Sequence, residues 1–122
     1  MKKGVIIFIF NITCLLILFI ALNSGDKYKN VKRVDGFIIS KAEIEVKEDE
    51  EISFLKAYVK NKNDEDVDNV KFKITFYNRD NKVIDEVVGY LGNVKSMETI
   101  ELNAAVSKKL VDVYDIKYEL ID

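Results

Sequence analysis

The feature that most constrains this chain is an apolar run near its N-terminus. Residues 5–22 contain only two polar side chains, Asn11 and Thr13, and two basic residues, Lys2 and Lys3, precede them. A helix of this length would extend about 27 Å, close to the bilayer core of about 30 Å. Because the run is apolar on every face and the remaining chain is too small to enclose it, we expect it to contact lipid.

Two interpretations of residues 1–24 stay open, a cleaved signal peptide and a retained transmembrane signal anchor. A signal peptide needs small residues just before its cleavage site. Cleavage after Ser24 would place Leu22 at the −3 position, and cleavage after Asn23 would leave an asparagine at −1. The sequence therefore favours the anchor. Four basic residues follow the run, but a basic start followed at once by an apolar run is typical of export, so we expect an extracytoplasmic domain.

Residue types that are missing narrow the range of functions. The chain has no histidine, which removes the most common general base and the usual zinc ligand. Its net charge is −2 with both signs interleaved, which argues against a nucleic-acid partner. Cys14, the only cysteine, lies inside the apolar run, so the outer domain cannot form an internal disulfide. We expect no enzyme activity and assign no catalytic, cofactor or metal-binding residues.

Beyond the run, we expect a polar, lysine-rich linker at residues 25–36 and one domain at residues 37–122. The linker is either a solvated spacer or a segment whose basic residues rest on anionic headgroups. In the domain, apolar and polar residues alternate with the period of half-buried strands. The predicted strands cover residues 37–39, 41–47, 52–61, 70–77, 82–91, 99–105 and 111–121.

The details of these strands predict the core. Val70, Phe72, Ile74 and Phe76 should point inward together. Doubled apolar residues in 82–91 indicate a bulge or burial on both faces. Residues 107–110 form either a helical turn or a loop. Short strands without an amphipathic helix between them predict an all-β fold, an antiparallel immunoglobulin-like β-sandwich, with a barrel as the alternative.

Two segments resemble the FxLYD family. Residues 55–64 are similar to its "x-V-x-N-x-(S/N)-(D/G)" strand and loop, and residues 70–84 resemble its central hairpin. Its naming motif would fall on Ile74, Thr75, Phe76, Tyr77 and Asn78, with Ile for Phe, Phe for Leu and Asn for Asp. Residues 95–100 lack the family's usual Pro-Gly. The resemblance covers residues 42–120. It implies an immunoglobulin-like sandwich on bacterial or archaeal envelope proteins, without catalytic residues.

Three groups of polar or aromatic residues are candidate sites. Residues 64–69, from Asp64 to Asn69, contain the D-x-D-x-D opening of a calcium loop, but they lack its glycine and its final glutamate, so a solvated acidic turn is favoured. Residues 48–51 would add carboxylates if both loops lay at one end of the sandwich. A tyrosine stripe on one sheet would suit a peptide or glycan; the tyrosines concerned are Tyr58, Tyr77, Tyr90, Tyr114 and Tyr118.

Together these features predict a non-catalytic binding or structural module of a bacterial envelope. It would be tethered to the cytoplasmic membrane through residues 5–22, or secreted if the leader is cleaved. Its partner would be an envelope protein or polymer. The alternative is an exported accessory subunit or sensor domain of a membrane complex whose partner carries the activity.

Overall fold

The structure is a computed structural model that describes residues 26–121. The predicted leader, residues 1–24, lies outside these residues. No helix within residues 26–121 is long and apolar enough to cross a membrane. The elements in chain order are η1 (Lys27–Lys29), β1 (Lys32–Val34), β2 (Phe37–Lys47), η2 (Glu48–Glu50), β3 (Ile52–Asn61), β4 (Val67–Tyr77), β5 (Val83–Val94), β6 (Thr99–Val106) and β7 (Asp115–Ile121).

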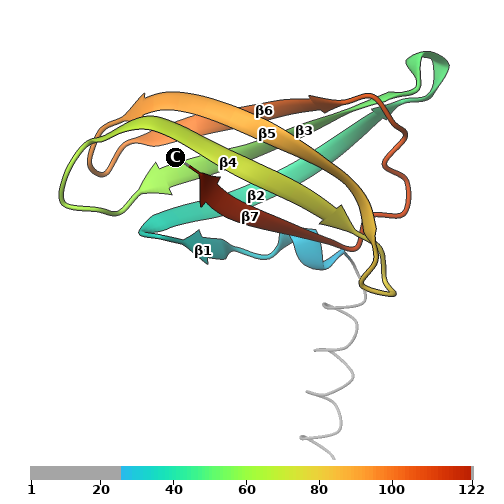
Figure 1. Cartoon of the computed structure of the whole chain (residues 1–122), viewed down its shortest axis with the longest axis horizontal. Helices are drawn as coiled ribbons and strands as arrows, with labels where there is room; N and C mark the ends of the chain where they lie inside the picture. Colours follow the sequence, from blue (N-terminus) through green and yellow to red (C-terminus); the bar gives the residue numbers. More distant parts are fainter. Residues whose placement is uncertain (1–25, 122) are drawn as a thin grey trace, which may run out of the picture.

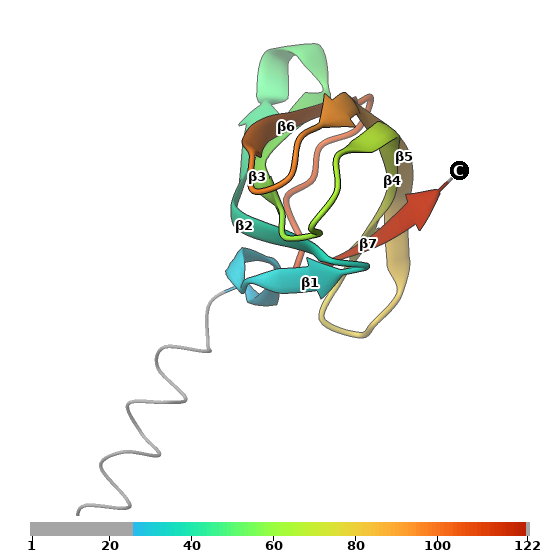
Figure 2. The ribbon, with the colours of Figure 1, turned by 90° about the vertical axis from the view of Figure 1, so that its left-hand side faces the viewer.

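The strands form two antiparallel sheets that pack face to face (Figure 2). We call the sheet with strand order β1-β2-β3-β6 sheet A and the sheet with order β5-β4-β7 sheet B. β3 lies beside β6, and β4 lies beside β7, as strands B and E and strands C and F do in immunoglobulin domains. The predicted immunoglobulin-like sandwich is therefore confirmed.

The core lies between the inner faces of the two sheets. The four inward residues predicted in β4 are all almost completely buried, and the alternation predicted in β3 and β6 is also confirmed. Phe37 of β2 and Phe72 of β4 meet edge to face across the sandwich, with ring centroids 5.6 Å apart. Such pairs contribute about 0.5–1.5 kcal/mol beyond the area they bury. This contact ties the first part of sheet A to the centre of sheet B.

β2 is one strand with a break in its alternation. Phe37 and Ile39 point inward at its start, whereas Ala42 is buried three residues later. The pairing with β3 shifts between Ser40 and Glu43, and Lys41 has a positive φ of 55°. The extra residue of this bulge moves the apolar side chains from odd to even positions. The two predicted segments, 37–39 and 41–47, therefore join into one strand.

β5 contains the predicted bulge and one unexpected glycine. Phe76 pairs with Asp85, but Tyr77 pairs with Val83, so one residue of β5 is extra. Gly89 is buried within this strand. A Cβ atom at Gly89 would lie 2.7 Å from a methyl carbon of Leu102, so β5 needs glycine there to pack against β6.

The domain begins earlier than the predicted boundary at residue 37. Residues 27–34, assigned to the linker, form η1 and β1, and β1 pairs with the start of β2. Tyr28 is buried, and its backbone N–H donates to the Tyr114 carbonyl at 2.9 Å. Tyr28, together with Val34, anchors a segment that is mostly polar, which explains why composition alone suggested a linker.

The last predicted strand is shorter than expected. β7 starts at Asp115, and residues 111–114 are irregular. The backbone N–H of Tyr114 donates to the Tyr77 carbonyl at 2.8 Å, which holds this segment against the end of β4. The undecided residues 107–110 are a loop, fixed where the Ser53 hydroxyl donates to the Lys108 carbonyl.

Candidate functional site

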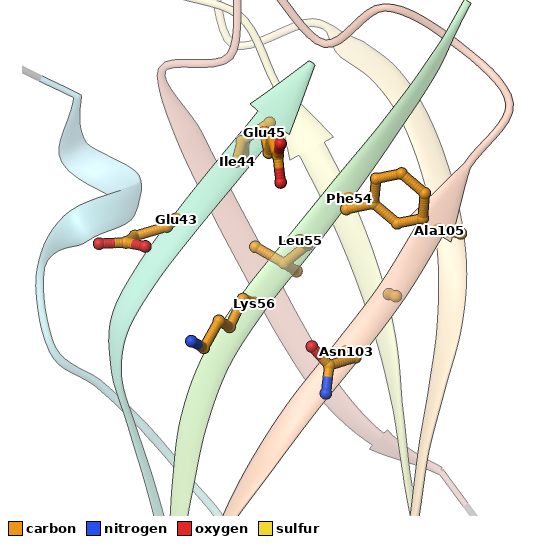
Figure 3. A pocket seen from close by; sticks show the side chains of 9 residues that line it. Glu43, Ile44, Glu45, Phe54, Leu55, Lys56, Asn103 and Ala105 are labelled. Atoms are coloured by element: carbon orange, nitrogen blue, oxygen red, sulfur yellow. The ribbon is translucent and has the colours of Figure 1, made fainter. Parts of the chain in front are cut away.

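A hollow that combines apolar and polar groups lies on the outer face of sheet A. It is open to solvent, has a volume of about 650 Å³ and crosses β2, β3 and β6. We call it the sheet-A groove (Figure 3). The residues around it are Glu43, Ile44, Glu45, Phe54, Leu55, Lys56, Asn103, Ala104 and Ala105.

Strand register explains which side chains meet in the groove. Phe54 of β3 lies opposite Glu45 of β2 on one side and Ala105 of β6 on the other. Because Ala105 is small, it leaves one side of the Phe54 ring uncovered, and Phe54 stays 39% exposed. Figure 3 shows the ring beside Ala105. An exposed ring with a free side can stack on a sugar ring or on an apolar side chain.

Polar groups lie two residues further along the same face. Lys56 pairs with Glu43 of β2 and with Asn103 of β6, so an ammonium, a carboxylate and an amide stand in one row across the sheet. A hydrogen bond with Tyr58 and the negative charge of Glu101 raise the pKa of Lys56, which keeps it cationic. The row supplies both donors and acceptors beside the Phe54 ring, a combination that fits a polar polymer with hydroxyl or amide groups.

The outer face of sheet B carries a second exposed patch. Val88 and Tyr90 of the edge strand β5 are 54% and 62% exposed. They lie opposite Lys73 and Lys71 of β4, respectively, and Lys71 also pairs with Ile121 of β7. Aromatic residues are enriched at protein–protein interfaces and lysines are depleted there, so the exposed Tyr90 ring, rather than the lysines beside it, is the feature that fits a protein partner.

The acidic loops do not come together. Residues 48–51 and 64–69 lie beyond opposite ends of β3, which separates them by about 33 Å for a ten-residue strand. The hypothesis of a shared carboxylate site is therefore wrong. The Asp66 carboxylate accepts a hydrogen bond from the Ser96 N–H at 2.8 Å, and Asp68 belongs to β4. Between residues 26 and 121, no group of three or more Asp, Glu, Cys or His side chains is arranged to hold a metal.

The tyrosines do not form one stripe. Tyr58 lies on the outer face of sheet A, where the ammonium groups of Lys41 and Lys56 stand 6.0 and 5.7 Å from its ring centroid. Tyr77 and Tyr90 belong to sheet B, and Tyr118 is buried in the core. Tyr114 stacks with Arg79 at 4.8 Å. The candidate tyrosine stripe on one sheet is therefore absent from the described domain.

A charged cluster joins the N-terminal segment to β7, and the sequence reasoning missed it. The buried Asp115 carboxylate lies 2.7 Å from the Lys32 ammonium and 4.0 Å from that of Lys27. Burial and the negative charge of Asp26 raise the pKa of Tyr28 in the same place. The ion pairs span more than 80 residues of sequence. No local pattern signals a contact between such distant residues, so only the fold could show it.

Comparison with known proteins gives little further information. No family model matches the chain, so the resemblance to the FxLYD family stays a prediction. No curated protein matches it either. Among solved structures, a DUF1425 family member from Shewanella sp. pv-4 is similar, at 10% sequence identity and a TM-score of 0.48, over 80% of this chain and 93% of that one. We draw no function from this similarity.

Proposed function

We propose that the chain is a non-catalytic binding or structural module of a bacterial envelope. Residues 5–22 hold it to the cytoplasmic membrane, and the sandwich lies on the outer side. The proposal is supported by the apolar run with its basic start and by the resemblance to the FxLYD family. The sheet-A groove is the surface that contacts the partner, and the exposed ring of Phe54 is the observation that carries this assignment.

The partner that best fits the groove is a glycan-containing polymer of the envelope. The free side of the Phe54 ring offers an apolar platform, and Glu43, Lys56 and Asn103 offer acceptors and donors on the same face. Sugars present both kinds of surface, C–H faces and hydroxyl edges. The groove is shallow and open, which suits one stretch of a long polymer more than an enclosed small molecule.

Retention on insoluble peptidoglycan and on envelope polysaccharide tests the groove. We expect Phe54→Ala to lower retention about two- to twelvefold, since loss of an aromatic stacking contact costs roughly 0.5–1.5 kcal/mol. Val88→Ala, which shortens an exposed apolar side chain on the opposite sheet, is the matched control and should bind like the unmodified chain. Equal retention of both variants would contradict the assignment of the groove.

A second candidate is an accessory subunit of a membrane complex, and the Val88 and Tyr90 patch favours it. In that case, crosslinking in the native membrane should recover one stoichiometric protein partner. Val88→Ala combined with Tyr90→Ala should weaken the complex, whereas Phe54→Ala should not. The two candidates therefore predict opposite outcomes for the same set of variants.

The membrane tether has its own test. Intact mass and fractionation of the protein from its host distinguish the anchor from a cleaved leader. A full-length mass in the membrane fraction supports the tether. A mass that begins near Ser24 or Gly25, in the soluble exported fraction, would contradict it and leave a secreted domain.

A further inference from the structure

Exposed apolar side chains lie at the end of the sandwich where the described chain begins. Three segments meet there: η1, the β4–β5 turn at residues 78–82, and the irregular residues 111–114 (Figure 1). We call this region the N-terminal corner. Two exposed apolar side chains border it, Val83 at 59% and Val111 at 63%. Both are among the most exposed large apolar residues of the domain.

The corner is close to the apolar run in sequence. Only three residues, Asn23, Ser24 and Gly25, separate Leu22 from Asp26. Even fully extended, the four peptide units between Leu22 and Asp26 span at most about 14 Å. The headgroup layer on each side of a bilayer is about 5–7 Å thick. A sandwich that starts within this reach of the hydrocarbon has little room to move away from the lipid surface.

The packing of η1 holds the first described residues against the sandwich, so they add no length to the tether. Tyr28 is buried two residues after Asp26, and its N–H bond to Tyr114 fixes it to the corner. Lys27 and Lys32 are attached to the sandwich through their ion pairs with Asp115. The domain is therefore held from its first residues, and the short segment 23–25 is the whole spacer between the fold and the apolar run.

We propose that the N-terminal corner is a lipid contact surface, seated in the phospholipid headgroup layer with Val83 and Val111 against the lipid. The inference rests on the proposed tether through residues 5–22. Basic and acidic side chains are mixed at the corner: Lys27, Lys29, Arg79 and Lys82 against Asp26, Asp80, Asp112 and Asp115. The short tether keeps the corner close to the lipid surface, and the mixed charges give little net attraction to it, so we expect the contact to be independent of salt and of anionic lipid.

Depth-dependent fluorescence quenching on the full chain in phosphatidylcholine vesicles tests this surface. In a Cys14→Ser background, a polarity-sensitive probe is attached at Val111→Cys, at Val83→Cys, or at Glu65→Cys as a control in the β3–β4 loop, beyond the far ends of β4 and β5. Quenchers on the lipid headgroups should quench the first two probes at least about twofold more than the control, because only they lie within the headgroup depth. High salt or added phosphatidylglycerol should leave the difference unchanged.

A lengthened spacer gives an independent check. About 12 added Gly and Ser residues between Ser24 and Gly25 extend the tether by roughly 20 Å, and they should remove the difference between the probes. If the chain floats with the vesicles but all three probes are quenched equally, the lipid contact surface is refuted while the tether stands. If the chain does not float with the vesicles, the tether itself is refuted, and the contact surface with it.

Discussion

Tyr118 of β7 carries a hydroxyl group that is buried in the core without a hydrogen-bond partner in the described structure. An unsatisfied buried polar group costs about 1–3 kcal/mol relative to its hydrated state. Replacing Tyr118 by phenylalanine removes this cost and gives up only the few van der Waals contacts of one oxygen atom, about 0.5 kcal/mol. We therefore expect Tyr118→Phe to raise the free energy of unfolding by about 1–2 kcal/mol.

Thermal unfolding of a fragment that starts at Asp26 measures this effect. For a domain of this size, 1 kcal/mol corresponds to about 4–8 °C, so Tm should rise by roughly 5–10 °C. Tyr90→Phe makes the same chemical change at a side chain that is 62% exposed, and its Tm should stay unchanged. A lower Tm for Tyr118→Phe would refute the reasoning, because it would mean that the buried hydroxyl is hydrogen-bonded.

The same hydroxyl predicts a pH dependence. Burial, and then the negative charge of Asp115, raise the pKa of Tyr118 above the ordinary tyrosine value, which is about 10 in the unfolded chain. Above that pH the unfolded state releases a proton that the folded state keeps, so stability falls as pH rises. The loss can reach about 1.4 kcal/mol per pH unit. We expect Tyr118→Phe to show a smaller alkaline loss than the unmodified domain.

Three further substitutions test other parts of the packing. Asp115→Asn breaks the ion pair with Lys32 and should lower the free energy of unfolding, measured in urea, by about 1.5–3 kcal/mol. Glu45→Gln, which breaks an exposed ion pair with Lys47, should lower it by less than about 0.5 kcal/mol. Equal losses would contradict the prediction. Gly89→Ala places a methyl group 2.7 Å from the Cδ1 methyl of Leu102 in β6 and should cost about 1–2 kcal/mol. An unchanged Tm would show that the Leu102 side chain or the sheets can move apart there. Asn61→Ala leaves the carbonyl oxygens of Glu65 and Val94 without their donor and should cost about 2–3 kcal/mol. A neutral result in the same urea assay would mean that water replaces the amide.

Period-two alternation allowed most of the sandwich to be predicted. In β4, four inward apolar residues at every second position are buried as expected, because a pleated strand between two layers has one dry and one wet face. The same reasoning located β3 and β6. The strand order within each sheet, with β3 beside β6 and β4 beside β7, was not predicted, because no single residue indicates which strands pair.

What sequence reasoning missed depends on contacts between distant residues. Tyr28 lies in a polar segment, and its burial is decided by Tyr114 and the start of β7. The small size of Gly89 matters because of Leu102 on the facing sheet, a contact that no local pattern indicates. The sheet-A groove is equally non-local. In the sequence, Phe54 is an ordinary outward residue of β3. Its ring stays exposed because its neighbour Ala105, some 50 positions later, is too small to cover it.

The bulge in β2 has a consequence for how this domain tolerates changes in length. Before Lys41 the odd positions point into the core, and after it the even positions do. Removing or adding one residue there would exchange the two faces over the whole second half of the strand and turn Glu43 and Glu45 inward. Lys41 itself is exposed, and glycine or asparagine would suit its positive φ of 55°. At this point of the fold, the number of residues matters more than their identity.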